Sequence, residues 1–198
     1  MSNFILAKKR FRDAVVKTHE VQILQRGGVG VIPTDTLYGI VGSAFSKKAV
    51  LRIYRLRKRN MKKPMIVLIG SLAQLWQFGI TPDAKLKKLL NYLWPGKVSI
   101  VLPCPSPKFR YLHRGTKSVA FRLPRARSLQ RFLMKTGPLV APSANIEGQP
   151  PARTIAEAKK YFGTRTDFYM DAGKRNSLPS TLVALRGKKV VVLRRGAK

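Results

Sequence analysis

Acidic residues are scarce in this sequence. The chain has 8 Asp and Glu against 40 Lys and Arg in 198 residues, which gives a formal charge of +32 at pH 7. No acid stands between Asp35 and Asp83 or between Asp83 and Glu147. Small domains usually carry a net charge of about 2–8 in magnitude. A surface this basic attracts polyanions with an affinity that falls as salt rises, so we expect contact with RNA.

Cysteine and histidine are also rare. Cys104 has no second thiol to pair with, which excludes an internal disulfide and favours a reducing compartment, so we expect a cytoplasmic protein. His19 and His113 lie far apart and have no Cys or acidic neighbours at the spacing of zinc ligands. No serine stands in a Gly-x-Ser-x-Gly motif, which argues against a Ser-His-Asp triad. We predict no metal site built from the protein's own side chains.

Long apolar runs and the common nucleotide-binding loops are missing. The first twelve residues contain an apolar run only at positions 4–6, which is too short for the core of a signal peptide. No segment approaches the roughly twenty apolar residues that span a bilayer, so no membrane contact is expected. Neither a Gly-x-x-x-x-Gly-Lys-Ser/Thr loop nor a Gly-x-Gly-x-x-Gly motif after a strand occurs. Any nucleotide must therefore be bound in another way.

The apolar residues that are present predict one α/β domain over residues 1–198. They make up 44% of the chain, which is ordinary for a globular protein of this length. Strand and helix patterns alternate, and a terminal hairpin adds antiparallel pairing, so we expect a mixed sheet with flanking helices. The expected helices cover 11–26, 47–56, 72–78, 82–93, 129–134 and 154–162. The expected strands cover 29–32, 65–69, 98–102, 119–123, 139–141, 168–170, 181–185 and 190–193.

Short polar segments follow several of these strands. They lie at 34–39, 57–63, 118–122, 143–145, 180–181 and 194–196. Ligand sites of open α/β sheets lie at strand ends, so these segments predict one shared cleft. Arg, Lys and hydroxyl groups suit the binding of a polyphosphate and the stabilisation of charge that moves during transfer. Arg122, in the middle of an apolar strand, requires a partner for its charge.

Six ordered motifs make the chain resemble the YrdC-like family of threonylcarbamoyl-AMP synthases over about residues 10–196. They are Pro-Thr-Asp-Thr-Leu-Tyr-Gly at 33–39, the region of the family's Lys-x-Arg at 57–59 with Lys63-Pro64 after it, Trp-Pro-Gly at 94–96, Val-Ala-Phe-Arg-Leu-Pro at 119–124, Ala-Pro-Ser-Ala-Asn at 141–145 with Gly148 and Pro150 following, and Pro-Ser-Thr-Leu-Val at 179–183. The resemblance implies an open, twisted, mixed α/β sheet with a cationic concave cleft. It also implies an enzyme that joins L-threonine, bicarbonate and ATP into threonylcarbamoyl-AMP and releases pyrophosphate, the first step of t6A modification at position 37 of tRNA.

The resemblance also implies roles for individual residues. The positions that correspond to threonine contacts are Thr36, Arg122, Ala141 and Ser180. The positions that correspond to nucleotide contacts are Arg59, Lys63, Ser118, Ser143, Pro151 and Arg194. The two short motifs with catalytic positions contain Arg57, Arg59, Ser143 and Asn145. ATP is then a substrate, Mg²⁺ bridges its phosphates, and tRNA and a tRNA threonylcarbamoyl-transferase are the implied macromolecular partners.

The chain departs from the family pattern at several points. Arg57 replaces the motif lysine, which keeps the charge but exchanges a compact ammonium for a planar fork. Leu68 stands where longer members often have histidine, and Pro151 where a small hydroxyl residue is common. The long C-terminal extension of some members is absent, which indicates the compact single-domain type. The charge is the largest departure, and our hypothesis is that the surface has been shifted toward positive charge on a family-like core.

Two alternatives remain at this point. A noncatalytic RNA-binding module on the same fold would also need many phosphate-binding arginines, so composition does not separate it from the enzyme. A carbamoyl-transfer domain of hydrogenase maturation shares the fold as well, but it normally works beside additional domains that 198 residues cannot hold.

Overall fold

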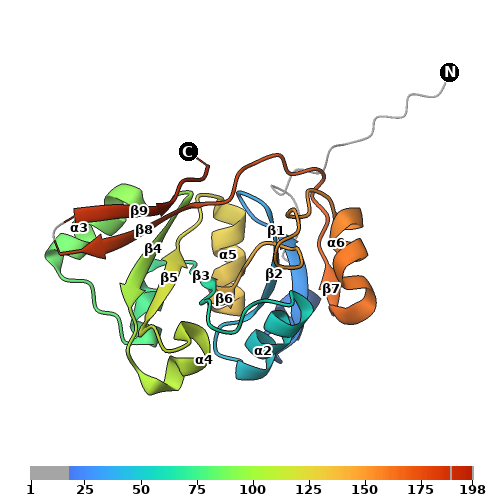
Figure 1. Cartoon of the computed structure of the whole chain (residues 1–198), viewed down its shortest axis with the longest axis horizontal. Helices are drawn as coiled ribbons and strands as arrows, with labels where there is room; N and C mark the ends of the chain where they lie inside the picture. Colours follow the sequence, from blue (N-terminus) through green and yellow to red (C-terminus); the bar gives the residue numbers. More distant parts are fainter. Residues whose placement is uncertain (1–17, 188, 198) are drawn as a thin grey trace.

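Runs of β-branched residues build a central mixed sheet. The structure is a computed structural model that describes residues 18–187 and 189–197, and within these residues the sheet has nine strands in the order β7-β1-β2-β6-β3-β5-β4-β8-β9 (Figure 1). β1 pairs with β7, β3 with β5, and β4 with β8 in parallel, and the other neighbours are antiparallel. The strands are β1 Val29–Pro33, β2 Tyr38–Ser43, β3 Ile66–Leu68, β4 Val98–Pro103, β5 Ser118–Arg122, β6 Leu139–Val140, β7 Phe168–Tyr169, β8 Thr181–Arg186 and β9 Lys189–Arg194. The prediction of an open, mixed α/β sheet is confirmed.

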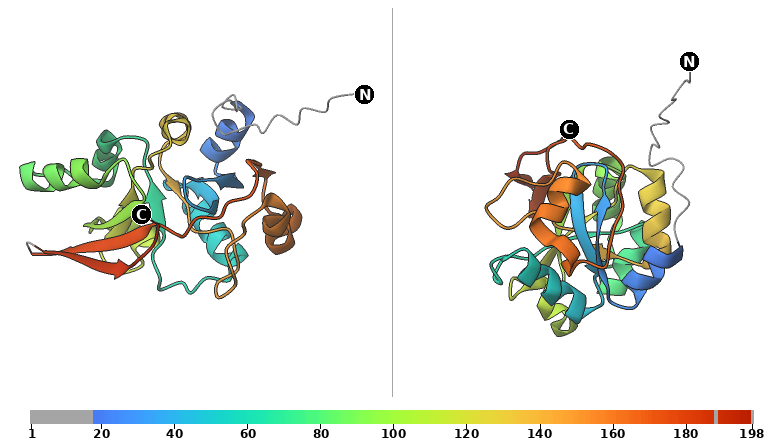
Figure 2. Two further views of the ribbon diagram at one scale, coloured as in Figure 1. Left: turned by 90° about the horizontal axis from the view of Figure 1, so that it is seen from above. Right: turned by 90° about the vertical axis from the view of Figure 1, so that its right-hand side faces the viewer.

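Helices flank the sheet. They are α1 Thr18–Gln25, α2 Lys47–Leu56, α3 Ala84–Leu93, α4 Arg110–His113, α5 Arg127–Thr136 and α6 Ile155–Phe162, with 3₁₀ turns η1 Leu72–Phe78, η2 Pro107–Phe109 and η3 Gly163–Arg165. α1 and α5 lie on one side of the sheet and α2 on the other (Figure 2). None of the helices in the described part of the chain is both long and apolar enough to cross a membrane.

The side chains of each strand point alternately to the two faces of the sheet, so the core has two layers. In β1 and β2, Val31 and Ile40 pack in the cluster that contains α2, whereas their neighbours Ile32 and Val41 pack in the cluster that contains α1 and α5. Successive side chains of a strand point to opposite faces, so each strand supplies both layers. Leu68 belongs to the α1 and α5 layer and is fully buried there. That position is therefore filled by packing and not by a polar contact.

The helix starts follow from capping residues in the sequence. Ser46 Oγ accepts the N–H of Ala49 at the start of α2. Thr154 Oγ1 accepts the N–H of Glu157 at the start of α6, as the capping-box spacing predicts. The start of α3 differs from the prediction. Its N-cap is Asp83, which accepts the N–H of Leu86, so the preceding proline lies outside the helix and not at its first position.

The sequence interpretation missed strand β2. The chain turns at residues 34–37 and returns antiparallel to β1, so that Pro33 pairs with Tyr38 and Ile32 with Gly39. Gly39 and Gly42 lower the strand propensity of this segment, which hid it. Packing favours glycine at position 42, because a Cβ there would lie only 3.1 Å from the Cβ of Ala49 in α2.

Three other segments differ from the prediction in extent or type. The loop expected between 102 and 119 contains the short helices η2 and α4. The helix predicted at 72–78 is a 3₁₀ helix, η1. Of the helix predicted at 11–26, the part before residue 18 lies outside the described residues, and α1 covers Thr18–Gln25.

Phe78 of η1 lies at the centre of an aromatic cluster in the α2 layer of the core. Its substitution tests the packing of that layer. Phe78 is 1% exposed, and its ring centroid lies 4.9–5.2 Å from those of Phe45, Phe109 and Phe121. Phe78→Ala is expected to lower the free energy of unfolding by about 3–5 kcal/mol, because it leaves a cavity among these rings. The measurement is urea denaturation followed by circular dichroism.

Trp76 provides the matched control. It lies in the same 3₁₀ helix and is 67% exposed, so Trp76→Ala is expected to change the free energy of unfolding by no more than about 0.5 kcal/mol. Equal losses for the two variants would contradict the packing assigned to Phe78.

Candidate functional site

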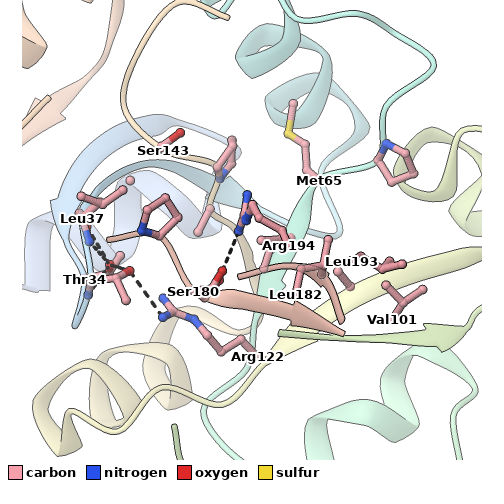
Figure 3. A pocket seen from close by; sticks show the side chains of 18 of the residues that line it. Thr34, Leu37, Met65, Val101, Arg122, Ser143, Ser180, Leu182, Leu193 and Arg194 are labelled. Carbon is pink, nitrogen blue, oxygen red and sulfur yellow. Dashed lines mark hydrogen bonds between the residues drawn. The ribbon is translucent and has the colours of Figure 1, made fainter. Parts of the chain in front are cut away.

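A cleft of about 390 Å³ opens at the ends of the central strands. Its walls come from segments far apart in the sequence, which are 34–39, 57–59, 64–66, 116–122, 141–143, 179–182 and 193–194 (Figure 3). The sheet order explains this convergence, because β2 lies beside β6 and β3 beside β5. The polar segments that follow different strands therefore meet at one place.

Most of the residues singled out in the sequence line this cleft. They are Thr36, Arg57, Arg59, Ser118, Arg122, Ala141, Ser143, Ser180 and Arg194. The lining does not include Lys63, Asn145 or Pro151. Asn145 lies behind the wall, bonded to Arg57, and Lys63 points to Glu147. Pro151 is partly buried in the segment that leads to α6.

A tight turn forms the wall around residues 34–37. Thr34 Oγ1 accepts the N–H groups of Thr36 and Leu37, each at 3.2 Å, and donates to the carbonyl of Leu37 at 2.6 Å. The same hydroxyl lies 3.1 Å from Thr36 Oγ1. Thr34 therefore shapes the backbone, and Thr36 presents its hydroxyl to the cleft.

Backbone pairing joins this turn to the Pro-Ser-Ala-Asn segment. Gly39 and Ser143 form an isolated antiparallel bridge, and Ala144 N–H donates to the carbonyl of Tyr38 at 2.9 Å. A Cβ on Gly39 would lie 3.4 Å from the carbonyl oxygen of Pro142. This is an ordinary van der Waals distance, so the backbone pairing of Gly39 with Ser143, and not the missing side chain, holds the two motifs side by side.

Asp35 is the partner that Arg122 requires. Arg122 is 4% exposed, and its Nη1 lies 3.0 Å from Asp35 Oδ1 and 3.4 Å from Thr36 Oγ1. The other carboxylate oxygen of Asp35 accepts the N–H of Arg125 at 3.0 Å. Burial lowers the pKa of Arg122, and the charge of Asp35 opposes that shift. Sequence reasoning predicted a partner for Arg122 but gave Asp35 no role.

Arg57 is buried against neutral groups. Its Nε donates to the carbonyl of Asn145 at 3.0 Å, and its Nη2 donates to Asn145 Oδ1 at 3.0 Å and Ser143 Oγ at 3.4 Å. Burial, together with the charge of Arg59, lowers the pKa of Arg57 to about 10, so the side chain is still a cation at neutral pH. Its Nη1 is buried and has no hydrogen-bond partner among the described residues.

Asn145 fixes the position of the Arg57 side chain. Asn145 Oδ1 also accepts from Ser143 Oγ at 2.7 Å, and Asn145 Nδ2 donates to the carbonyls of Ile146 and Gln149. The amide is therefore bonded on both its oxygen and its nitrogen. A fork held in this way directs a cation to a defined place beside the cleft.

Arg59 and Arg194 add two more cations. Arg59 Nη2 donates to the carbonyl of Pro64, and Arg194 Nη2 donates to the carbonyl of Ser180, both at 2.9 Å. Burial and the charge of Arg59 lower the pKa of Arg194. Two guanidinium groups at one wall of the cleft form a place where an anion is stabilised.

The donors around the cleft do not suit a metal held by the protein alone. Among residues 18–187 and 189–197, no group of three or more His, Cys, Asp or Glu is arranged to hold a metal ion. The carboxylate nearest to Arg59 and Lys63 is that of Glu147, which already accepts from Asn60 N–H and Lys63 Nζ. A divalent cation fits here only if the ligand's own oxygens supply its coordination.

Comparisons with known proteins agree with one another. Residues 22–196 match the Sua5/YciO/YrdC family model, which is described as telomere recombination. A putative threonylcarbamoyl-AMP synthase of Mycobacterium tuberculosis is 32% identical over 178 residues, which are 89% of this chain and 82% of the relative.

Two solved structures share the architecture. Pyrococcus abyssi Sua5 in complex with L-threonine is 28% identical with a TM-score of 0.82 over 90% of this chain, and the chain spans 53%, about half, of that protein. E. coli YciO is 25% identical with a TM-score of 0.79, over 90% of this chain and 87% of that one.

The buried pair of Asp35 and Arg122 gives a test of the geometry. Asp35→Asn leaves the Arg122 charge without its ionic partner, so the free energy of unfolding is expected to fall by about 3 kcal/mol. Urea denaturation at neutral pH measures this. The double variant Asp35→Asn, Arg122→Met removes the uncompensated charge and is expected to be more stable than the single variant. A single variant within about 1 kcal/mol of the parent, as for an exposed pair, would contradict the assignment.

Proposed function

The chain belongs to the Sua5/YciO/YrdC family, and we propose from this that it is a threonylcarbamoyl-AMP synthase, a nucleotidyltransferase. It condenses L-threonine, bicarbonate and ATP and releases pyrophosphate, which begins t6A modification at position 37 of tRNA. The observation that carries the proposal is the convergence of Arg57, Arg59 and Arg194 with the Arg122 subsite in one cleft. The first three arginines suit a polyphosphate, and Arg122 suits the carboxylate of an amino acid.

The threonine subsite is formed by Thr36, Arg122, Ala141 and Ser180. Arg122 binds the carboxylate of the substrate, and its guanidinium is already oriented by Asp35 and Thr36. The hydroxyls of Thr36 and Ser180 bind the polar groups of a small amino acid. Ala141 leaves room because its side chain is short. The related P. abyssi protein, solved with L-threonine, supports this assignment.

The nucleotide subsite is formed by Arg59, Ser118, Ser143 and Arg194 with Arg57 beside them. Arginine and hydroxyl donors bind phosphate oxygens and neutralise their charge. Lys63 and Pro151 lie outside the lining, but Lys63 directly precedes Pro64, which is part of it. Mg²⁺, when bound on the phosphates of ATP, neutralises charge that develops on the leaving pyrophosphate.

Catalysis in such a site is mainly positioning and electrostatic stabilisation. The amine of threonine bonds to the carbon of bicarbonate, and a C–O bond of bicarbonate breaks with loss of water to give the carbamate. A carbamate oxygen then bonds to the α-phosphorus of ATP as the bond from that phosphorus to the pyrophosphate oxygen breaks and pyrophosphate leaves. Fixed donors around these atoms lower the barrier because they are oriented before the reaction begins. The Nη1 of Arg57 has no hydrogen-bond partner among the described residues, while Nη2 of the same guanidinium contacts Ser143. We assign it to an oxygen of the reacting groups.

The alternative function is a noncatalytic RNA-binding module on the same fold. The observation that favours it is the formal charge of +32, which exceeds what a small-molecule site needs. In the enzyme, the same surface would bring the protein to tRNA and to the transferase that accepts the intermediate. The two functions differ in whether ATP is turned over.

Pyrophosphate release distinguishes the two functions. In bicarbonate buffer with ATP and Mg²⁺, the protein is expected to release pyrophosphate only when L-threonine is added, because the carbamate must form before the nucleotide is attacked. A coupled phosphate assay with and without threonine measures it. If release stays at background at protein concentrations that bind RNA, the enzyme assignment is wrong and the RNA-binding alternative stands.

Arg57→Lys tests the fixed fork. A lysine has one nitrogen and cannot reach both Asn145 acceptors and Ser143 as the guanidinium does. Turnover is therefore expected to fall about tenfold through misplacement of the reacting phosphate. Arg55→Lys is the matched control, because Arg55 is exposed in the last turn of α2 and the control should keep parental turnover. A higher turnover of Arg57→Lys would show that the fork misplaces the phosphate instead.

A further inference from the structure

The cationic strip, residues 57–63, is held by one neighbouring carboxylate among the residues that the structure describes. The strip contains Arg57, Lys58, Arg59, Lys62 and Lys63, and the sequence has no acid from 36 to 82. Like charges at this density repel one another, so the loop requires an anion beside it to keep its shape. That anion comes from a different part of the chain.

Glu147 supplies it from the segment after Asn145. Its Oε2 accepts the N–H of Asn60 at 2.6 Å, and its Oε1 lies 3.0 Å from Lys63 Nζ and 3.6 Å from Arg59 Nη1. Its own N–H donates to the carbonyl of Arg57 at 2.8 Å. Both carboxylate oxygens are therefore engaged with the strip, and two of the cations they contact are predicted nucleotide ligands.

Glu147 contacts the same side chains, Lys63 and Arg59, that are the predicted phosphate ligands. Hydrogen bonds from Asn60 N–H and Lys63, followed by the charges of Lys63 and Arg59, lower the pKa of Glu147, so it is an anion at neutral pH. A phosphate group that binds Lys63 and Arg59 meets the same two side chains that the carboxylate occupies. The two anions repel each other if both remain.

We propose that Glu147 is an internal competitor for the polyphosphate at Lys63 and Arg59, and that its carboxylate returns to these cations as pyrophosphate leaves. This rests on the proposed function only in taking the strip as the polyphosphate site. Glu147 thereby limits how tightly the product binds, and it keeps the strip folded between turnovers. It is a positioning residue for the cations and not a group that contacts the reacting atoms.

The competition predicts a gain of affinity on removal of the carboxylate. Glu147→Gln keeps an oxygen that can accept the N–H of Asn60 but loses the charge on Lys63 and Arg59. Inorganic pyrophosphate, titrated calorimetrically without added metal, is expected to bind about three- to fivefold more tightly to the variant. A purely structural role of Glu147 gives the opposite sign, because a loosened strip binds pyrophosphate more weakly.

Glu157→Gln is the matched control. Glu157 caps α6, where it accepts the N–H of Arg153, and its loss raises the net charge by the same amount away from the strip. Its pyrophosphate affinity should equal that of the parent. In the background of Lys63→Gln, the gain from Glu147→Gln should shrink, because one shared cation is gone. Thermal unfolding followed by circular dichroism confirms that each variant is folded.

The outcomes separate this inference from the proposed function. Equal or weaker pyrophosphate binding by Glu147→Gln, or a gain matched by Glu157→Gln, overturns the competition and leaves the enzyme assignment intact. Failure of pyrophosphate to bind either protein overturns the competition together with the nucleotide subsite. Tighter binding by Glu147→Gln in a protein without threonine-dependent turnover supports the competition and rejects the enzyme.

Discussion

The burial of two guanidinium groups, Arg57 and Arg122, is the constraint on which the site depends. Each is only 4% exposed, and a buried cation costs several kcal/mol unless its surroundings compensate. Different groups compensate the buried charges of Arg57 and Arg122. Arg122 pairs with the carboxylate of Asp35, whereas Arg57 is bonded to the carbonyl and side-chain oxygens of Asn145 and to Ser143. This difference sets how strongly each cation can act on a ligand.

A cation that is bonded to neutral groups keeps more of its charge for a ligand than one that is already in an ion pair. Arg57 is oriented by the dipoles of Asn145 and Ser143, which suits it to the phosphate that we propose it binds. Arg122 is nearly neutralised by Asp35 and suits a substrate with one carboxylate, where selectivity comes from fit and not from net charge. Glu147 provides the intermediate case, because its contacts with Lys63 are on the surface and can be exchanged for those of a ligand.

Much of the fold could be predicted from the sequence, because local patterns determine it. The caps at Ser46 and Thr154 and the β-branched strands are confirmed by the structure. β2 could not be recognised, because Gly39 and Gly42 lower its strand propensity, and the packing of Gly42 against α2 is a tertiary contact that local propensity does not contain.

For the site, the sequence indicated which segments would be polar but not their order in the sheet. The bridge of Gly39 with Ser143 depends on that order. The ion pairs of Asp35 with Arg122 and of Glu147 with Lys63 also join residues that are far apart in the sequence. No rule of sequence spacing predicts such pairs.

The few acids of this chain stand at contacts that the fold or the site uses. Most of the acids in the described residues have a definite task. Asp83 and Glu157 cap helices, and Asp167 binds both Arg52 and the N–H of Val29. Asp171 accepts from the phenol of Tyr38, and Asp35 and Glu147 hold cations of the site. A carboxylate that is fixed against a backbone N–H or a cation stabilises the local structure at that contact. Because the few acids stand at such contacts, a chain with a formal charge of +32 can still form an ordered cleft.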